Sequence, residues 1–94
     1  MKTYCVYILK CADASYYTGL TSNLDDRIRQ HQEGEWIKSY TYSRRPVKLL
    51  YYESYQWVWD AIAREKQIKG WSRVKKEALI AGNLKALKEN SKSK

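Results

Sequence analysis

Residues 3–10 carry hydrophobic or aromatic side chains on both of their alternating faces, and this feature constrains the fold most. The stretch is rich in β-branched and aromatic residues, which favour β-strands. A strand that is apolar on both faces has to be covered on both sides. We therefore expect residues 3–10 to form a central strand with further structure packed on each face of its sheet.

A turn-like segment at 12–15 separates this strand from a second predicted strand at 15–20. So short a connection joins antiparallel neighbours, which predicts a hairpin and excludes an all-parallel sheet. The later pattern predicts, in order, a helix from a cap at 21–23 to Glu33, a strand at 47–53, helices at 56–69 and 72–81, and a short last helix capped by Asn83.

The predicted fold class is α+β, with a three-stranded, largely antiparallel sheet flanked by helices. We expect a single domain over residues 1–89 and a disordered basic tail at 90–94. The tryptophan-rich stretch at 55–59 is interpreted as a helix start packed on the third strand, and an exposed interface is the alternative.

The chain is basic, with 18 Lys and Arg against 10 Asp and Glu and a net charge of +8, which favours a polyanionic partner. The candidate phosphate-binding residues are Arg44, Arg45, Arg64, Lys66, Lys69, Arg73, Lys75 and Lys76. Cys5 and Cys11 would lie about 20 Å apart on one strand, too far for a disulfide. Free thiols indicate the cytoplasm, and no stretch approaches the ~20 apolar residues that would span a membrane.

Glu65 stands on the apolar stripe of its predicted helix, between Ala61 and Ile68. A carboxylate on such a stripe is usually paired or holds a metal. A structural ion pair with Arg27 is one interpretation. A functional cluster with Arg27 and the hydroxyl or imidazole side chains of other segments is the other.

The order of several short motifs resembles the GIY-YIG nuclease family. Residues 5–7 and 17–19 resemble its two signature tripeptides, with Cys5 in place of Gly and Thr18 in place of Ile. Residues 24–31, 43–47 and 63–69 resemble its helix and the later motifs of its small free-standing bacterial members. These members are related to the N-terminal domain of the excinuclease C subunit, and the likeness covers about residues 3–84.

The resemblance implies a DNA endonuclease that uses one Mg²⁺ or Mn²⁺ ion, held by Glu65. It implies that Arg27 stabilises developing negative charge and that Tyr7 and Tyr17 hydrogen-bond the phosphate and the attacking water. His31 would assist proton transfer. Gly19 and Asn83 are accessory candidates: Gly19 allows a close backbone approach, and a plain N-cap explains Asn83 equally well.

The general base is open between Tyr17 and His31. Lowering the pKa of a phenol from about 10 to neutrality costs ~4 kcal/mol, whereas a free imidazole with a pKa near 6.5 needs no shift. Energy alone therefore favours His31, and the resemblance favours Tyr17 with His31 as its helper.

The predicted function is hydrolysis of phosphodiester bonds in DNA, selected by shape rather than sequence, with a role in DNA repair. Branched or damaged DNA is the expected partner, RNA remains an alternative, and the oligomeric state is open. The alternative functions are a catalytically silent nucleic-acid-binding module and an adaptor domain.

Overall fold

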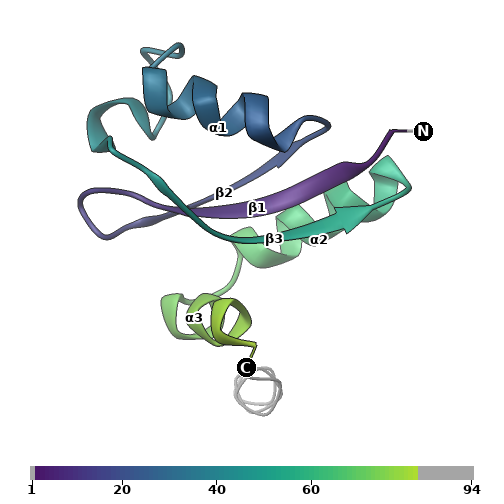
Figure 1. Ribbon diagram of the computed structural model, residues 1–94. Helices are drawn as coiled ribbons and strands as arrows, with labels where there is room; N and C mark the ends of the chain where they lie inside the picture. The colour runs from purple at the N-terminus through teal and green to yellow at the C-terminus, as the bar shows by residue number, and fades with distance from the viewer. Residues whose placement is uncertain (1, 83–94) are drawn as a thin grey trace.

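The computed structural model describes residues 2–82. Its elements, in chain order, are β1 (Tyr4–Lys10), β2 (Tyr16–Thr21), α1 (Leu24–Glu33), the short 3₁₀ turn η1 (Tyr42–Arg44), β3 (Lys48–Tyr55), α2 (Val58–Lys69) and α3 (Arg73–Ala81) (Figure 1). The predicted α+β fold class is confirmed.

The three strands form an antiparallel sheet in the order β2-β1-β3, so β1 is central as its two apolar faces predict. In this register Tyr7 of β1 pairs with Gly19 of β2 on one side and with Tyr52 of β3 on the other. β2 is therefore an edge strand, and Gly19 stands directly beside Tyr7.

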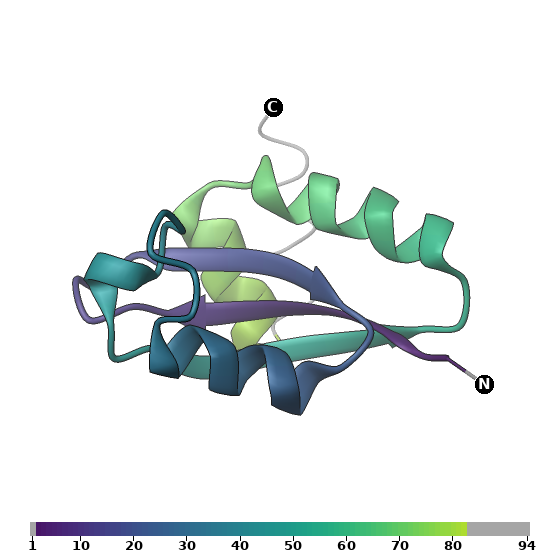
Figure 2. The same ribbon diagram turned by 90° about the horizontal axis from the view of Figure 1, so that it is seen from above.

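The helices cover opposite faces of the sheet, with α1 on one side and α2 and α3 on the other (Figure 1). Val6 and Ile8 of β1 pack with Ala61 and Ile68 of α2, while the alternate residues of β1 pack toward α1. Figure 2 shows α2 running alongside β2, which brings α2 close to the free edge of the sheet.

Local capping signals set the helix boundaries. The Asn23 side chain accepts a hydrogen bond from the backbone N–H of Asp26 at 3.1 Å and begins α1, which ends at Gly34 in the left-handed conformation. Ser72 caps α3 in the same way, and Gly82 ends it. These predicted boundaries match the structure.

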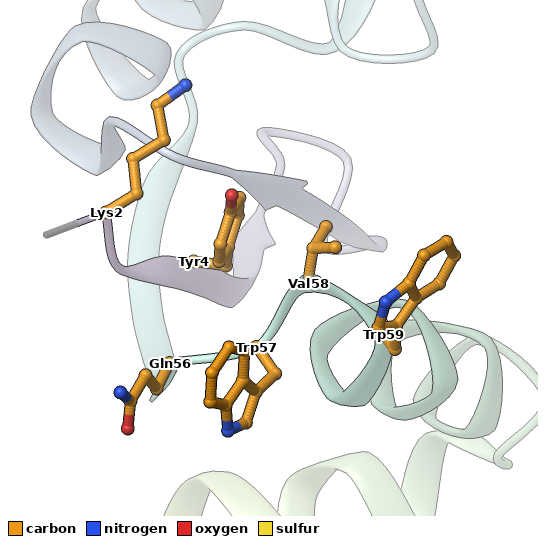
Figure 3. A pocket seen from close by; sticks show the side chains of 6 residues that line it. All are labelled: Lys2, Tyr4, Gln56, Trp57, Val58 and Trp59. Carbon is orange, nitrogen blue, oxygen red and sulfur yellow. The ribbon is translucent and has the colours of Figure 1, made fainter.

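The start of the second helix and the surroundings of its tryptophans were predicted wrongly. β3 continues to Tyr55 and α2 begins at Val58, two residues later than expected. Trp57 is 62% exposed and Trp59 is 77% exposed, so neither is packed on β3. Both line a pocket with Lys2, Tyr4, Gln56 and Val58 at the chain-start end of β1 (Figure 3).

The predicted last helix, Asn83, the domain boundary at residue 89 and the basic tail lie outside the described residues. Within residues 2–82, no helix is long and apolar enough to cross a membrane.

Candidate active site

Of the predicted catalytic residues, Tyr7 lies at the buried centre. Its ring lies over Gly19, where an added Cβ would come within 2.3 Å of the Tyr7 hydroxyl oxygen. Real Cβ atoms do not approach other atoms this closely, so only glycine fits opposite Tyr7. The missing side chain lets the phenol of the central strand extend across β2 toward the sheet edge.

His31, on the last turn of α1, holds the Tyr7 hydroxyl. Its Nε2 lies 2.9 Å from the Tyr7 hydroxyl oxygen, and its Nδ1 lies 2.8 Å from the hydroxyl oxygen of Thr41. Burial, followed by the charge of Arg27, lowers the pKa of His31, so the ring is neutral at pH 7. A neutral imidazole has one donor and one acceptor nitrogen, and both are taken by these hydroxyls.

Tyr17 stands in an aromatic group beside Tyr7. Its ring centroid is 6.3 Å from that of Tyr7, 5.2 Å from that of His31 and 6.1 Å from that of Tyr40, on which it stacks. Tyr17 is only half-buried, unlike Tyr7 and His31. Its phenol is therefore the more accessible of the two predicted catalytic phenols.

Arg27 lies one helical turn before His31, as its spacing predicts. It donates a hydrogen bond to the backbone oxygen of Leu20 at 3.3 Å, and its guanidinium carbon lies 5.1 Å from the ring centroid of Trp36. The Arg27 charge also acts on Tyr7, whose pKa it lowers against the larger opposing effect of burial.

Glu65 lies on α2, on the other face of the sheet, and acts weakly on the Tyr7 phenol. Burial first, then Tyr17 and more weakly Glu65, raise the pKa of Tyr7 to about 12. The weak effect of Glu65 on the Tyr7 phenol is an electrostatic link between α2 and the residues on the other face of the sheet. Its ion pair is with Lys69 at 3.3 Å, rather than with Arg27 as the structural interpretation expected.

The donor set fits a hydrated divalent cation. The Glu65 side chain is 19% exposed, so part of it is open to solvent. Within residues 2–82, no group of three or more His, Cys, Asp and Glu side chains is arranged to hold a metal. Mg²⁺ commonly binds through one or two carboxylates, keeps several waters and takes further ligands from phosphate oxygens, which a single partly exposed Glu side chain allows.

The predicted phosphate-binding arginines of the loop before β3 are both engaged in contacts within the protein. Arg44 pairs with Asp13 at 3.0 Å and lies 3.9 Å from the Tyr40 ring centroid. Arg45 donates to the backbone oxygen of Tyr42 at 2.8 Å. These contacts fix the loop that carries Tyr40 and Thr41 over α1 and β2.

Arg64 is held by an ion pair between α2 and β3. It makes a bidentate ion pair with Glu53 of β3, with both N–O distances at 2.9 Å. The Tyr51 and Tyr55 hydroxyls donate to the same carboxylate. Arg64 therefore joins α2 to β3, and its predicted contact with DNA would compete with this network.

The remaining predicted phosphate-binding residues divide into two groups. Some are held by contacts within the protein, and the others are exposed or line a hollow. Arg73 pairs with Glu77 at 3.4 Å, and Lys75 is buried with its ammonium 4.4 Å from the Trp71 ring centroid. Lys66 is exposed, and Lys69 and Lys76 line a hollow together with Tyr17. The last two are the predicted phosphate-binding residues that lie beside Tyr17.

Sequence reasoning gave no role to Thr41, Trp36 or Tyr40, all from the loop after α1. Thr41 is buried against His31, and the ring centroid of Trp36 lies 5.2 Å from that of His31. The aromatic content of this loop was visible in the sequence. Its path back over α1 was not.

Comparisons with known proteins point to one family. A family model described as the GIY-YIG catalytic domain matches residues 3–78. A UPF0213 protein of Syntrophus aciditrophicus is 45% identical over 78 residues, which cover 83% of this chain and 90% of the relative. A UPF0213 protein of Natronomonas pharaonis is 46% identical over 76 residues, which cover 81% and 88%.

Two solution structures share the fold. A UPF0213 protein from Bacillus halodurans is similar with a TM-score of 0.57 and 37% identity, covering 86% of this chain and 85% of that one. A protein from E. faecalis is similar with a TM-score of 0.62 and 29% identity, covering 87% and 86%.

Proposed function

This chain belongs to the GIY-YIG nuclease family, and we propose that it is a divalent-metal-dependent endonuclease that hydrolyses phosphodiester bonds in DNA. The observation that carries the proposal is the convergence on the Tyr7 phenol. His31 lies 2.9 Å from it, and Arg27, Tyr17 and Glu65 all act on its pKa. Such a mixture of burial and opposed charges around one phenol is typical of catalytic sites.

Tyr7 would act as a hydrogen-bond donor to a phosphate oxygen. With a pKa of about 12 it keeps its proton at neutral pH. His31 would hold this phenol in place, because both of its nitrogens are taken by hydroxyls and neither is left for a water or phosphate. His31 is then a positioning residue that acts through Tyr7, and it does not compete with Tyr17 as a direct base.

Tyr17 would accept the proton of the attacking water. It is the more accessible phenol, and it lines the hollow that faces Lys69 and Lys76. Arg27 would stabilise the negative charge that develops on the phosphate, as a fixed guanidinium does in a partly dry site.

Glu65 would hold one Mg²⁺ or Mn²⁺ ion, which supplies charge stabilisation at the scissile phosphate and its leaving oxygen when it is bound. The side chain is suited to this because it is half-buried yet partly open to solvent, and its partner Lys69 is itself exposed. Because Lys69 is exposed, solvent screens its pair with Glu65, and Glu65 would exchange this partner for a metal ion.

DNA would be recognised by shape rather than by sequence. The predicted contacts are cations that meet phosphates, and phosphate contacts carry no direct sequence information. Branched or damaged DNA, a role in repair and action in the cytoplasm are part of the proposal. The free thiols of Cys5 and Cys11 suit a reducing compartment.

The test is cleavage of plasmid and branched DNA with Mg²⁺ or Mn²⁺. We expect Glu65→Gln to lower the rate at least about 100-fold, because several kcal/mol of charge stabilisation are lost. Glu33→Gln is the matched control, since Glu33 is an exposed helix acid 56% accessible to solvent. Chelation with EDTA should abolish cutting by the wild-type protein.

A second pair of variants addresses the phenols. Tyr7→Phe should slow cleavage by about 100-fold or more, within the range of lost proton-transfer and hydrogen-bonding groups. Tyr52→Phe removes an exposed phenol from β3, the strand that pairs with β1 on the side away from β2. It should leave the rate unchanged. Cutting that survives Glu65→Gln refutes the proposed mechanism, and salt-sensitive binding without cutting in either metal supports the silent binding module instead.

A further inference from the structure

A hollow of about 240 Å³ lies along β2 beside the candidate active site. It is lined by Tyr16, Tyr17, Thr18, Tyr40, Lys69 and Lys76. Residues from both faces of the sheet meet here, because successive residues of a strand point to opposite sides. Tyr17 belongs to both this hollow and the catalytic cluster, so the two share a wall.

Two lysines line this hollow from different helices. Lys69 ends α2 and Lys76 lies in the first half of α3. Burial first, and then the charge of Lys69, lower the pKa of Lys76. The charged form of Lys76 is thus disfavoured in its present surroundings, and an anion between the two lysines would relieve that cost.

Thr18 supplies an unpaired hydroxyl in the wall of the same hollow. It is 3% exposed, and its Oγ1 is the buried side-chain polar atom in the described part of the chain that has no hydrogen-bond partner. A buried hydroxyl without a partner costs about 1–3 kcal/mol. The Oγ1 atom is shielded from solvent, so a phosphate oxygen reaches it only when the surrounding side chains move aside, and the rotatable hydroxyl hydrogen would then be donated to it.

We propose that Lys69, Lys76 and Thr18 form a phosphate subsite that holds a backbone phosphate of the bound strand next to the one that is cleaved. This inference rests on the proposed function. It assigns to two of the eight predicted phosphate-binding residues a defined ligand and position. Arg44, Arg64 and Arg73 are each paired with an acid of this chain. Lys69 is paired with Glu65 at 3.3 Å, and it would exchange this partner for the phosphate when Glu65 holds the metal ion.

The subsite has a consequence for the substrate. A strand that ends at the cleaved phosphate leaves the two lysines without their ligand. The enzyme therefore requires at least one further phosphate on the side of the cut that faces α3. This requirement is independent of base identity, since neither lysine nor threonine would contact a base edge.

The first experiment detects the site without DNA. Inorganic phosphate is titrated into the metal-free, isotope-labelled protein, and the methyl resonance of Thr18 is followed by NMR. We expect saturable shifts at Thr18 and in the first turns of α3. Thr18→Val and Lys76→Gln should each weaken the phosphate affinity about tenfold, as the loss of a charge-assisted contact predicts. Lys48→Gln, an equal change of charge at the start of β3, should not.

Thr18→Val also separates binding from folding. Replacing an unpaired buried hydroxyl with a methyl group of similar shape should leave the melting temperature unchanged or raise it. A loss of phosphate affinity in a variant of equal or greater stability cannot come from misfolding. Shifts that do not saturate, or that are the same in Thr18→Val as in the wild type, overturn the proposal.

The second experiment locates the phosphate within the strand. Oligonucleotides carrying one neutral methylphosphonate at successive positions are bound to wild-type protein and to Lys76→Gln in chelator. We expect one position, adjacent to the cleaved phosphate, at which the methylphosphonate weakens wild-type binding about tenfold but leaves Lys76→Gln unaffected. An effect of Lys76→Gln that is equal at every position overturns the subsite while leaving the nuclease proposal intact. Saturable phosphate binding in a protein that never cuts DNA refutes the nuclease proposal alone.

Discussion

Gly19→Ala tests whether the Tyr7 phenol depends on the missing side chain opposite it. The new Cβ would lie 2.3 Å from the Tyr7 hydroxyl oxygen and 2.4 Å from Cζ, so the ring has to move by about 1 Å to reach ordinary contact distance. Overpacking of this kind costs about 1–3 kcal/mol. Moving the phenol also breaks its hydrogen bond to buried His31, which adds about 1 kcal/mol or more.

The expected total is about 3 kcal/mol, which corresponds to a melting temperature about 12–24 °C lower for a domain of this size. Thermal unfolding followed by circular dichroism measures it. Gly70→Ala is the matched control. Gly70 has a negative φ, and its added Cβ would meet its nearest neighbour at 3.6 Å, so alanine should be neutral or stabilising by up to ~1 kcal/mol. Equal stability of the two variants would refute the argument that Tyr7 occupies the space above Gly19.

Three further predictions concern the elements that support the site. Arg64→Met should destabilise the protein by about 2–3 kcal/mol in urea unfolding, because it leaves the half-buried Glu53 carboxylate without its cation. Arg29→Met, at an exposed helix surface, should have a much smaller effect. Burial would raise the pKa of Glu53, but its hydrogen bonds from Arg64 and the neighbouring phenols hold it below its ordinary value of 4.5. The stability gained from this depressed pKa is present above pH 4.5 and is lost as the pH falls through the folded-state value, so Glu53→Gln should flatten the melting-temperature profile below pH 4.5 relative to wild type. Asn23→Ala should cost about 1 kcal/mol by removing the cap of α1, and an unchanged melting temperature would show that the cap is replaced by water.

The sheet and the helix ends were predictable because their signals are local. The two apolar faces of residues 3–10 indicated a central strand, and Asn23, Gly34 and Ser72 marked helix boundaries through backbone preferences that hold in any fold. The convergence of Arg27 and His31 on one side of α1 likewise follows from their spacing of four residues.

The surroundings of the tryptophans were predicted wrongly, although the helical repeat of their segment could be read from the sequence. Trp59 shares its stripe on α2 with Ala63 and Lys66, at spacings of four and seven residues, and all three are exposed. The buried stripe holds Ala61 and Ile68 instead. The hydrophobicity of the tryptophans suggested that they are buried. Their position in the helical repeat was the better indicator, because it places Trp59 on the exposed stripe.

Long-range partners could not be read from the sequence. The Glu53–Arg64 pair joins a strand to a helix across eleven positions, and the His31–Thr41 hydrogen bond depends on the path of an irregular loop. Neither has a pattern of spacing that specifies it. The same limit applies to His31, whose position beside the inner face of α1 was predictable and whose enclosure by two hydroxyls was not.

In the proposed mechanism, the position of β2 at the edge of the sheet is what would allow residues from opposite faces to act on one phosphate. Tyr7 and Tyr17 point toward α1, whereas Glu65 belongs to α2 on the other side. In the interior of a sheet the backbone would separate them. Because Gly19 has no side chain, the Tyr7 phenol extends over β2, the edge strand that α2 runs alongside. The glycine is thus needed for the reach of the tyrosine, and a side chain at position 19 would displace the phenol from His31 even if both residues were retained.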